Sequence, residues 1–504
     1  MHRRSVAFVI AAACAVLHFL PTDGTRTGGV SSAGVRAASA PTDLWNLDRV
    51  NQAALPLDSN TAFGDLTGAG VDIYVVDSGI RATHEQLTGR VLAGFDVLTD
   101  TGMSPVSPRG SDCDGHGTHV ASLAAGATVG VARGARVIAV RVLDCNGNGE
   151  IYDVVAGLEW IRAHHQSGRA AIANLSLGVD IGDDGTQIIE MLNELEAEGI
   201  VVVTAAGNGD SAGNGIDACR VAPGSDPGSF NVGALTKADA PTFYSNYGAC
   251  VDIWAPGGDR TNGVNGAWYR SDVDYLGDIG TSMAAPLVAG AIALLAGRQP
   301  TLCPEQYTDA LIERSTKNAI TGLKGDSPNR LLFVDTAPVT SLRPPGKPSN
   351  IIITPDSSSL LVGWDPPCDG GSAVTSYTVS VLFGGKVVKR VKVDAAKTAV
   401  RVRGLQPGRG YAVVVKPTNA IGPGVATRRI PAPRVLSLRK GTALSLDWLV
   451  HTDSDTDVKV TSLTPKVCRV RPTRIIGLST GTCRYTVVPN GAETGVTRTI
   501  RVAP

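Results

Sequence analysis

The sequence lacks a net charge, paired cysteines of the zinc-binding kind, low-complexity tracts and nucleic-acid-binding motifs. Its 46 Lys and Arg residues balance 46 Asp and Glu residues, so the chain has no overall positive charge that would attract nucleic acid. None of the nine cysteines has CxxC spacing, which argues against a structural zinc site. We therefore expect neither a nucleic-acid partner nor a zinc ion.

The apolar run near the N-terminus is short for a membrane span. Met1-His-Arg-Arg4 precedes a mostly apolar stretch from Ser5 to Leu20, which is the pattern of a secretory signal. Ala38-Ser-Ala40 has the small-x-small form of a cleavage site. We interpret residues 1–40 as a signal peptide followed by a short disordered or pro segment, and we expect a secreted protein.

Eight cysteines remain when Cys14 is assigned to the signal. An even number of cysteines in an exported chain favours disulfides. Counting alone does not give their connectivity, so most pairings stay open at this point.

The chain of 504 residues is too long for one hydrophobic core. Residues 41–337 alternate strand patterns, such as Val71–Val76 and Val137–Leu143, with helix patterns, such as Asp153–His164 and Gln187–Glu198. Short apolar strands separated by helices predict an α/β fold with a doubly wound, mostly parallel sheet. In such a sheet, ligands bind beyond the carboxyl ends of the strands.

A Pro-rich linker at residues 338–348 precedes two small all-β sandwich domains, predicted at residues 349–430 and 434–504. Within the last domain we expect Cys468 and Cys483 to form a disulfide. From residue 338 onward the chain has 24 basic and nine acidic residues. Either two unlike domains were joined, or the basic part docks on an anionic polymer or cell surface.

A tight turn leads into a helix of small apolar residues within Asp278–Pro286. This places Ser282 in the first helical turn, where unpaired backbone N–H groups and the positive end of the helix dipole stabilise an oxyanion. The alternative is that Ser282 caps an ordinary core helix.

Three further residues supply the groups that a serine nucleophile needs: a base, a group that orients the base, and an oxyanion donor. His116 lies among glycines before a helix, Asp77 ends a buried strand, and Asn208 follows another strand. Singly, each residue also suits a cap or a turn. In the order Asp, His, Asn, Ser they favour a catalytic site.

Five motifs resemble those of the subtilisin-like serine proteases (subtilases), in the branch of proteinase K and aqualysin. They are Asp77-Ser-Gly79, His116-Gly-Thr-His119, Asn174-Leu-Ser-Leu-Gly178, Ala206-Gly-Asn208 and Gly280-Thr-Ser-Met-Ala284. The resemblance covers residues 41 to about 337 and implies a secreted endopeptidase with the triad Asp77, His116 and Ser282. Asn208 and the Ser282 N–H would form the oxyanion hole. Gly404-Leu-x-Pro407 ahead of Tyr411, with Trp364, similarly resembles a fibronectin type III domain.

The same resemblance implies that a peptide substrate binds as an extra strand between two segments. One segment is Ser176-Leu177-Gly178, and the other is Gly147-Asn-Gly149 with Ile151. The specificity pocket would be walled by Gly178, Val179 and the residues Ala205 to Gly207, and these walls imply a preference for uncharged side chains. Val179 stands where the family usually has a second glycine, so we expect a narrowed pocket.

The cysteine positions also resemble those of aqualysin-like proteases. This implies bridges between Cys113 and Cys145 and between Cys219 and Cys250. Cys303 and Cys368 are left over. A bridge between the protease domain and the first sandwich is one of two alternatives for them, and two separate thiols are the other.

A structural Ca²⁺ is implied in the same way, because Asp252, Pro227 and Ser229 stand at positions matching a calcium site of the family. Hard oxygen ligands suit Ca²⁺. The alternative is that Asp252 merely starts a strand.

Two departures flank the nucleophile: Leu287 replaces a usual His, and Asp278-Ile279 replaces the usual residues before the glycine. A catalytically weak or inactive binding protein on the protease fold is therefore kept as the alternative. Ester hydrolysis on an α/β-hydrolase fold is disfavoured because Ser282 has no Gly-x-Ser-x-Gly motif and the triad order differs. We expect a monomer that acts on protein or peptide substrates.

Overall fold

The structure is a computed structural model in which Met1–Leu342 and Arg343–Pro504 form two compact units. It describes residues 10–11, 41–100, 110–166, 168–180, 185–355, 359–406, 410–427, 429–432, 437–439, 443–445, 458–471, 474–479, 481–489 and 496–503. Apart from β1 (Ile10–Ala11), the expected signal peptide and its cleavage site lie outside the described residues.

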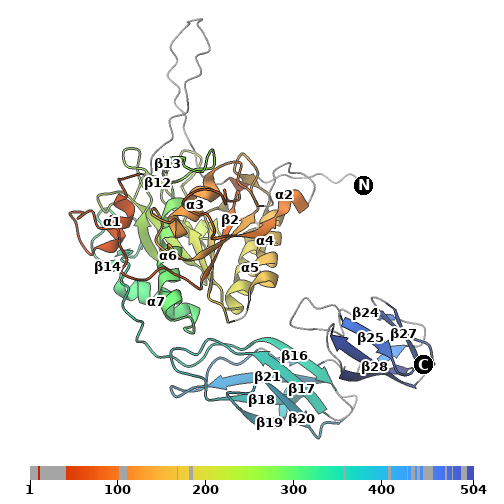
Figure 1. Cartoon of the computed structure of the whole chain (residues 1–504). Coiled ribbons are helices and arrows are strands. Elements are labelled where there is room, and N and C mark those ends of the chain that lie inside the picture. The colour runs from red at the N-terminus through yellow and green to blue at the C-terminus, as the bar shows by residue number, and fades with distance from the viewer. Residues whose placement is uncertain are drawn as a thin grey trace, which may run out of the picture. The chain divides into compact units, whose positions relative to one another are not determined.

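The first unit is built on a nine-stranded sheet with the order β14-β15-β11-β10-β8-β6-β2-β4-β3 (Figure 1). Its strands are β2 (Asp72–Asp77), β3 (Val91–Asp96), β4 (Arg136–Arg141), β6 (Ala171–Leu175), β8 (Val201–Ala205), β10 (Phe230–Leu235), β11 (Ile253–Pro256), β14 (Thr316–Lys317) and β15 (Arg330–Leu331). Every neighbouring pair is parallel except β14–β15. The predicted mostly parallel sheet is confirmed.

Short strand pairs lie outside this sheet. They involve β5 (Asn148–Gly149), β7 (Val179–Asp180), β9 (Val221–Ala222), β12 (Val264–Ala267) and β13 (Tyr275–Asp278). β1 pairs with β5, β7 with β9, and β12 with β13, all antiparallel.

Helices cover both faces of the large sheet. They are α1 (Trp45–Asn51), α2 (Val97–Asp100), α3 (His116–Ala125), α4 (Ile151–His164), α5 (Gly185–Ala197), α6 (Thr281–Arg298) and α7 (Pro304–Arg314). Successive side chains of a strand point to opposite faces. Accordingly, Ile73 and Val75 of β2 join the core with α3 and α6, whereas Tyr74 and Val76 join the core with α4 and α5. β2 therefore lies between two apolar cores, one on each face of the sheet, which explains why all six of its residues are buried.

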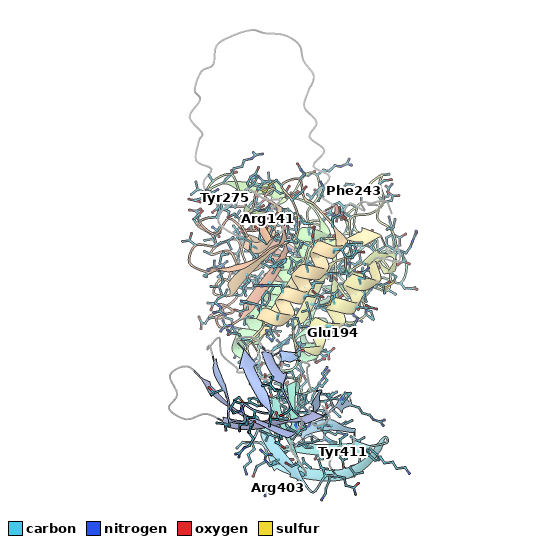
Figure 2. All side chains as sticks on the ribbon, turned by 90° about the vertical axis from the view of Figure 1, so that its right-hand side faces the viewer. Arg141, Glu194, Phe243, Tyr275, Arg403 and Tyr411 are labelled. Carbon is cyan, nitrogen blue, oxygen red and sulfur yellow. A yellow bond between two sulfur atoms is a disulfide. The ribbon has the colours of Figure 1, made fainter. Side chains whose placement is uncertain are left out.

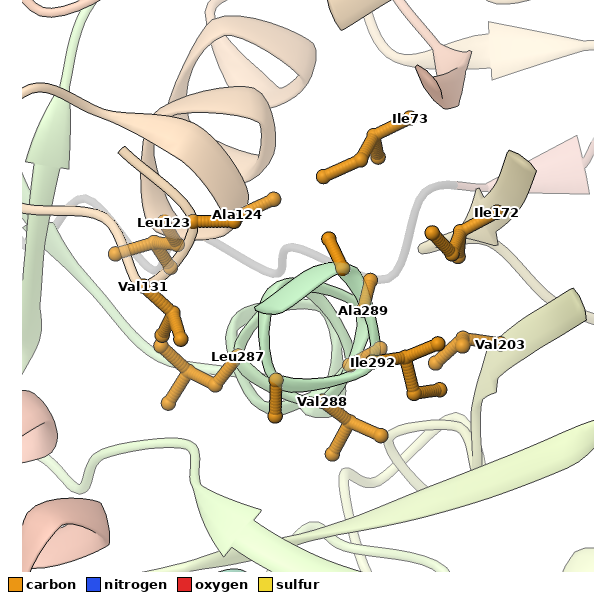
Figure 3. Packing of buried hydrophobic residues seen from close by; sticks show 14 of the residues in the cluster. Ile73, Leu123, Ala124, Val131, Ile172, Val203, Leu287, Val288, Ala289 and Ile292 are labelled. Atoms are coloured by element: carbon orange, nitrogen blue, oxygen red, sulfur yellow. The ribbon is translucent and has the colours of Figure 1, made fainter. Parts of the chain in front are cut away.

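The helix α6 runs through the core on one face of the sheet and is seen along its axis in Figure 3. Its Ile292 lies toward Val203 of β8, and its Leu287 lies toward Val131. A Cβ atom at Gly290 would lie 2.7 Å from the Ala124 carbonyl oxygen, so a glycine lets α6 approach α3 closely. Among the described residues, α6 alone is long and apolar enough to span a membrane, but it is mostly buried inside this unit.

The carboxyl ends of three central strands meet at one edge of the sheet. Val76 of β2 pairs with Leu175 of β6, and Leu175 pairs with Thr204 of β8. Asp77, Ser176 and Ala205 therefore end or follow adjacent strands at the edge where parallel sheets bind ligands.

Among its described residues the second unit has strands but no helices. Its first part has two sheets, β16-β17-β20 and β19-β18-β21-β22, with the bounds β16 (Ser349–Pro355), β17 (Ser359–Asp365), β18 (Ser376–Phe383), β19 (Lys386–Asp394), β20 (Ala399–Arg403), β21 (Tyr411–Thr418) and β22 (Ile430–Pro431). Trp364 and Tyr377 meet in its core with ring centroids 5.0 Å apart. Tyr411, labelled in Figure 2, accepts the Gln406 N–H on its hydroxyl at 2.9 Å.

The last part contains β23 (Ser437–Arg439), β24 (Ala443–Ser445), β25 (Val458–Ser462), β26 (Cys468–Arg471), β27 (Arg474–Gly477), β28 (Gly481–Pro489) and β29 (Val496–Ala503). The expected disulfide between Cys468 and Cys483 is formed.

Candidate active site

Asp77 and His116 lie in contact at the carboxyl end of β2. The His116 Nδ1 atom lies 2.8 Å from Asp77 Oδ1 and 2.9 Å from Oδ2. Asp77 ends the strand and His116 begins α3, and both are buried, with 0% and 2% of their surface exposed. The other ring nitrogen, His116 Nε2, has no hydrogen-bond partner among the described residues. The pair therefore has the geometry of a histidine base oriented by a carboxylate.

The carboxylates around His116 stabilise its charged form. Burial alone lowers the pKa of the imidazole, but Asp77 outweighs that effect, and the net result is a pKa raised to about 9. Asp278 and Asp114 contribute smaller electrostatic effects in the same direction. A proton taken up by His116 is therefore held firmly.

Ser282 is the second residue of α6 and is 3% exposed. Its Oγ donates to the Ser176 carbonyl oxygen at 3.2 Å. In return, the Ser176 Oγ donates to the Ser282 carbonyl oxygen at 3.0 Å and accepts a hydrogen bond from Asn174 Nδ2 at 3.0 Å. The structure thus places the nucleophile candidate against the end of β6.

Asn208 is fixed by the residue before Ser282. Its Oδ1 accepts hydrogen bonds from the Thr281 N–H at 2.9 Å and from the Thr281 hydroxyl at 2.8 Å. A Cβ atom at Gly280 would lie 3.3 Å from Asn208 Nδ2. The amide nitrogen, a donor, therefore lies beside the start of α6, as an oxyanion hole requires.

The predicted pocket walls occupy the ends of β6 and β8. Gly207 has a φ of +98°, and a Cβ atom there would lie 2.5 Å from Asn246 Nδ2. That nitrogen donates to the Ala206 carbonyl oxygen at 2.8 Å, and the Asn246 N–H donates to the Gly207 carbonyl oxygen at 3.0 Å. Both the backbone conformation and the space thus require glycine at this position.

Val221 lies against the same walls, and the sequence interpretation missed it. The Val221 Cγ1 atom would be 3.3 Å from a Cβ at Gly178 and 3.5 Å from a Cβ at Gly207. Val221 comes there because β9 pairs with β7 immediately after Gly178. Nothing in its own neighbourhood in the sequence signals this approach.

The remaining predicted substrate residues lie in and around the short strand β5 and at the start of α4. Asn148 and Gly149 form β5, Gly147 precedes it, and Ile151 starts α4. An antiparallel strand, β1, pairs with β5. Val179 lies in β7, but its side chain is outside the described residues, so the narrowed pocket stays a prediction.

The two disulfides expected in the first unit are formed. Cys113 pairs with Cys145 beside the His116 loop, and Cys219 pairs with Cys250. The buried Arg141, labelled in Figure 2, lies next to the first bridge, with its Nη2 atom 3.0 Å from Cys113 Sγ. The connection of Cys303 and Cys368 stays a prediction.

The predicted calcium ligands lie near the start of β10. Asp252 Oδ2 accepts the N–H of Asn231 at 2.8 Å, and Asn231 follows Ser229 and Pro227 closely in the sequence. Nearby, the carboxyl groups of Glu196 and Asp226 lie together. Burial and the charge of Asp226 raise the pKa of Glu196 to about 8, so this pair can share a proton. No cluster of three or more His, Cys, Asp or Glu side chains that could hold a metal is found among the described residues, and the Ca²⁺ site stays a prediction.

Comparison with known proteins agrees with this geometry. Residues 68–330 match the subtilase family, and residues 346–432 match the fibronectin type III domain. The chain is 41% identical over 290 residues to the "Extracellular serine proteinase" of Thermus sp. (strain Rt41A), covering 57% of this chain and 65% of that protein. It is 35% identical to the "Alkaline serine exoprotease A" of Vibrio alginolyticus, covering 58% of this chain and 50% of that one. Both matches thus span less than two thirds of the relative.

Comparison with solved structures agrees with these sequence matches. The solved structure of "a cold adapted subtilisin-like serine proteinase" superposes with a TM-score of 0.52 and 35% identity, and the match covers 59% of this chain and all of that one. More than half of the chain matches the family, and so the protein belongs to the subtilase family.

Proposed function

We propose that this chain is a secreted serine endopeptidase that hydrolyses peptide bonds through an acyl-enzyme on Ser282. The observation that supports this most is the buried contact of His116 Nδ1 with the Asp77 carboxylate, at 2.8 and 2.9 Å. It fixes the tautomer in which Nε2 is the basic nitrogen. Membership in the subtilase family and the names of the relatives agree with this activity.

In the first half of the reaction, Ser282 Oγ leaves the Ser176 carbonyl and attacks the scissile carbonyl carbon, while its proton passes to His116 Nε2. Negative charge then develops on the substrate oxygen, which accepts hydrogen bonds from Asn208 Nδ2 and the Ser282 N–H. The C–N bond breaks when His116 gives its proton to the leaving amine. Water repeats these steps with the acyl group and regenerates the Ser282 hydroxyl.

A substrate would bind as an extended strand between Ser176-Leu177-Gly178 and Gly147-Asn-Gly149. The main chain of β5 already makes an antiparallel pair, with β1, and a substrate strand would pair with it in the same way. The specificity pocket would be bounded by Gly178, Ala205, Gly207 and Val221, which carry no charge. The enzyme would therefore prefer uncharged side chains.

The proposal also covers where the protein acts and which metal ion it binds. Disulfides persist in oxidising compartments outside the cytosol, and the Thermus relative is named extracellular. A Ca²⁺ ion would be held by Asp252 and by the carbonyl oxygens of Pro227 and Ser229, and would supply structural stability rather than chemistry. The protease would act as a monomer.

The second unit would hold the enzyme on an anionic polymer at a cell surface. Its fibronectin type III part, residues 346–432, has 12 Lys and Arg residues against four Asp. Four of the cations, Lys386, Lys389, Arg390 and Lys392, are exposed on β19. Among the described residues none of these four forms an ion pair with an acid, so their field faces solvent. Retention of this unit on an anionic polymer resin, with release by salt, would test the idea.

The activity is tested by cleavage of unfolded casein with Ca²⁺ present. Wild-type protein should cleave it, and both Ser282→Ala and a covalent serine-protease inhibitor should abolish cleavage. If folded wild-type protein cleaves no casein and takes up no inhibitor, the inactive protease-fold binding protein becomes the better account.

A further inference from the structure

Asp112, in the turn before α3, gathers five hydrogen bonds on one carboxylate. Its Oδ1 accepts from the Ser78 hydroxyl at 3.0 Å and from the N–H groups of Asp114 and Gly115 at 3.0 and 2.9 Å. Its Oδ2 accepts from Thr118 N and Oγ1, at 2.9 and 2.5 Å. The side chain itself is only partly exposed. Only an ionised carboxylate can accept from every one of these donors.

These contacts connect the segments that hold the two members of the dyad. Ser78 directly follows Asp77, and its hydroxyl also accepts the N–H of Gly117 at 3.0 Å. Gly117 in turn directly follows His116. Asp112 therefore reaches the chain on both sides of the Asp77–His116 contact without touching either catalytic side chain.

The two segments leave no room for adjustment. A Cβ atom at Gly117 would lie 2.2 Å from the Gly79 carbonyl oxygen and 3.1 Å from Asp77 Cβ. The backbones at the end of β2 and the start of α3 are thus in close contact. A small shift of the turn at Asp112 must change the distance between His116 and Asp77.

We propose that Asp112 is a positioning residue that sets His116 against Asp77 and toward Ser282. It acts through Ser78 and through the backbone of the turn before α3. This inference rests on the proposed peptidase function. The ordinary alternative is that Asp112 only caps the helix and stabilises the fold.

The charge of Asp112 gives the two alternatives different pH dependence. Burial raises its pKa to about 6, the hydrogen bonds from Thr118 and Gly115 oppose this, and the charge of Asp77 raises it further. Protonation adds an O–H to one carboxyl oxygen, and each of the two oxygens already faces at least one backbone N–H, which cannot accept it. If Asp112 positions the dyad, log kcat/KM should fall with slope one below about pH 9 as His116 protonates, and with slope two below about pH 6.

The decisive variant is Asp112→Asn, which keeps the size of the side chain but turns an NH₂ either toward the N–H groups of Asp114 and Gly115 or toward that of Thr118. We expect kcat to fall about 100-fold with KM changed less than about twofold, because misplacement of a reacting group by about 1 Å costs that much. The second step of the pH profile should disappear. Asp239→Asn is the matched control: it breaks a carboxylate contact with the Arg49 Nε and Nη2 atoms, at 2.7 and 2.9 Å, outside the site. This control should lower Tm but leave kcat unchanged.

A kcat for Asp112→Asn within about twofold of wild type, with Tm lowered as in Asp239→Asn, would overturn the proposal. If Asp112→Asn does not fold, Ser78→Ala decides the question. It cuts the connection to Asp77 but leaves the four bonds from the turn, so it should fold and lose about tenfold in kcat. Unchanged kcat in Ser78→Ala would reject the positioning role.

A spectroscopic readout separates this inference from the peptidase proposal. The proton that His116 Nδ1 shares with Asp77 should give a low-field NMR resonance in Ser282→Ala protein. Adding Asp112→Asn should shift or broaden it, whether or not the chain cleaves peptides. An unchanged resonance would count against positioning.

Discussion

Ser282 and Ser176 are joined by two reciprocal hydrogen bonds, each running from the hydroxyl of one residue to the carbonyl oxygen of the other, at 3.2 and 3.0 Å. The first bond keeps the nucleophile candidate directed at the segment that would bind substrate. The second anchors the backbone of the first turn of α6 to the end of β6. In the proposed mechanism, a substrate strand paired with Ser176-Leu177-Gly178 would compete for this carbonyl and release the Ser282 hydroxyl for proton transfer to His116.

The Ser176 hydroxyl should therefore matter for catalysis although it takes no part in bond breaking. In Ser176→Ala we expect kcat on a peptide anilide to fall about tenfold, because the anchor on the Ser282 backbone is lost. KM should change little, since the backbone of the segment remains. Ser122→Ala is a matched control, because Ser122 also makes two buried hydrogen bonds, to the His119 carbonyl oxygen and from the Ala267 N–H. Equal kcat values for the two variants would contradict the prediction.

Asp278, one of the unusual residues before the nucleophile, should shift the working pH. Its charge helps to raise the pKa of His116, which reaches about 9. Because only neutral His116 can act as a base, wild-type kcat/KM should rise about tenfold per pH unit between about pH 6 and pH 9 and then level off. Asp278→Asn should move this midpoint to lower pH. Asp259→Asn changes the net charge equally and should leave it in place.

The same ionisation predicts a stability change of known sign. The folded pKa of His116 lies above its ordinary value of 6.5. The charged pair with Asp77 should therefore contribute its full stability below about pH 6.5 and lose it as the pH rises through about 9. Thermal unfolding of Ser282→Ala, which cannot digest itself, would measure the loss. A Tm that rises over this interval would contradict the assignment.

Val221 should limit the size of the side chain that enters the pocket, because its Cγ1 atom approaches both glycine walls. Val221→Ala should raise kcat/KM for a Phe substrate relative to an Ala substrate by about tenfold, as expected for one or two carbon atoms in an apolar pocket. Val137→Ala, in the buried strand β4, removes the same atoms from the core and should leave the ratio unchanged. An unchanged ratio in Val221→Ala would show that Val221 does not face the substrate.

The sequence predicted those parts of the fold and site that depend on local pattern. The apolar strands fixed the sheet, and residues at their carboxyl ends, Asp77 and Ser176, do meet at one edge. The roles of Val221 and Asp112 were not predicted, because they depend on contacts with segments distant in the sequence. Val221 reaches Gly178 only through the pairing of β9 with β7, and Asp112 reaches Ser78, 34 residues earlier, only once α3 packs on β2. No periodicity or spacing in the chain encodes those contacts.

Calcium removal should destabilise the protease unit if Asp252 holds the ion with the carbonyl oxygens of Pro227 and Ser229. A ligand at 100 times its Kd stabilises by about 2.7 kcal/mol, which corresponds to a Tm shift of roughly 5–10 °C at about 2–4 °C per kcal/mol. A chelator should lower the Tm of Ser282→Ala by that amount, and excess Ca²⁺ should restore it. Adding Asp252→Asn should remove most of this response, whereas adding Asp259→Asn should not. A full chelator response in the Asp252→Asn protein would place the stabilising ion elsewhere in the chain.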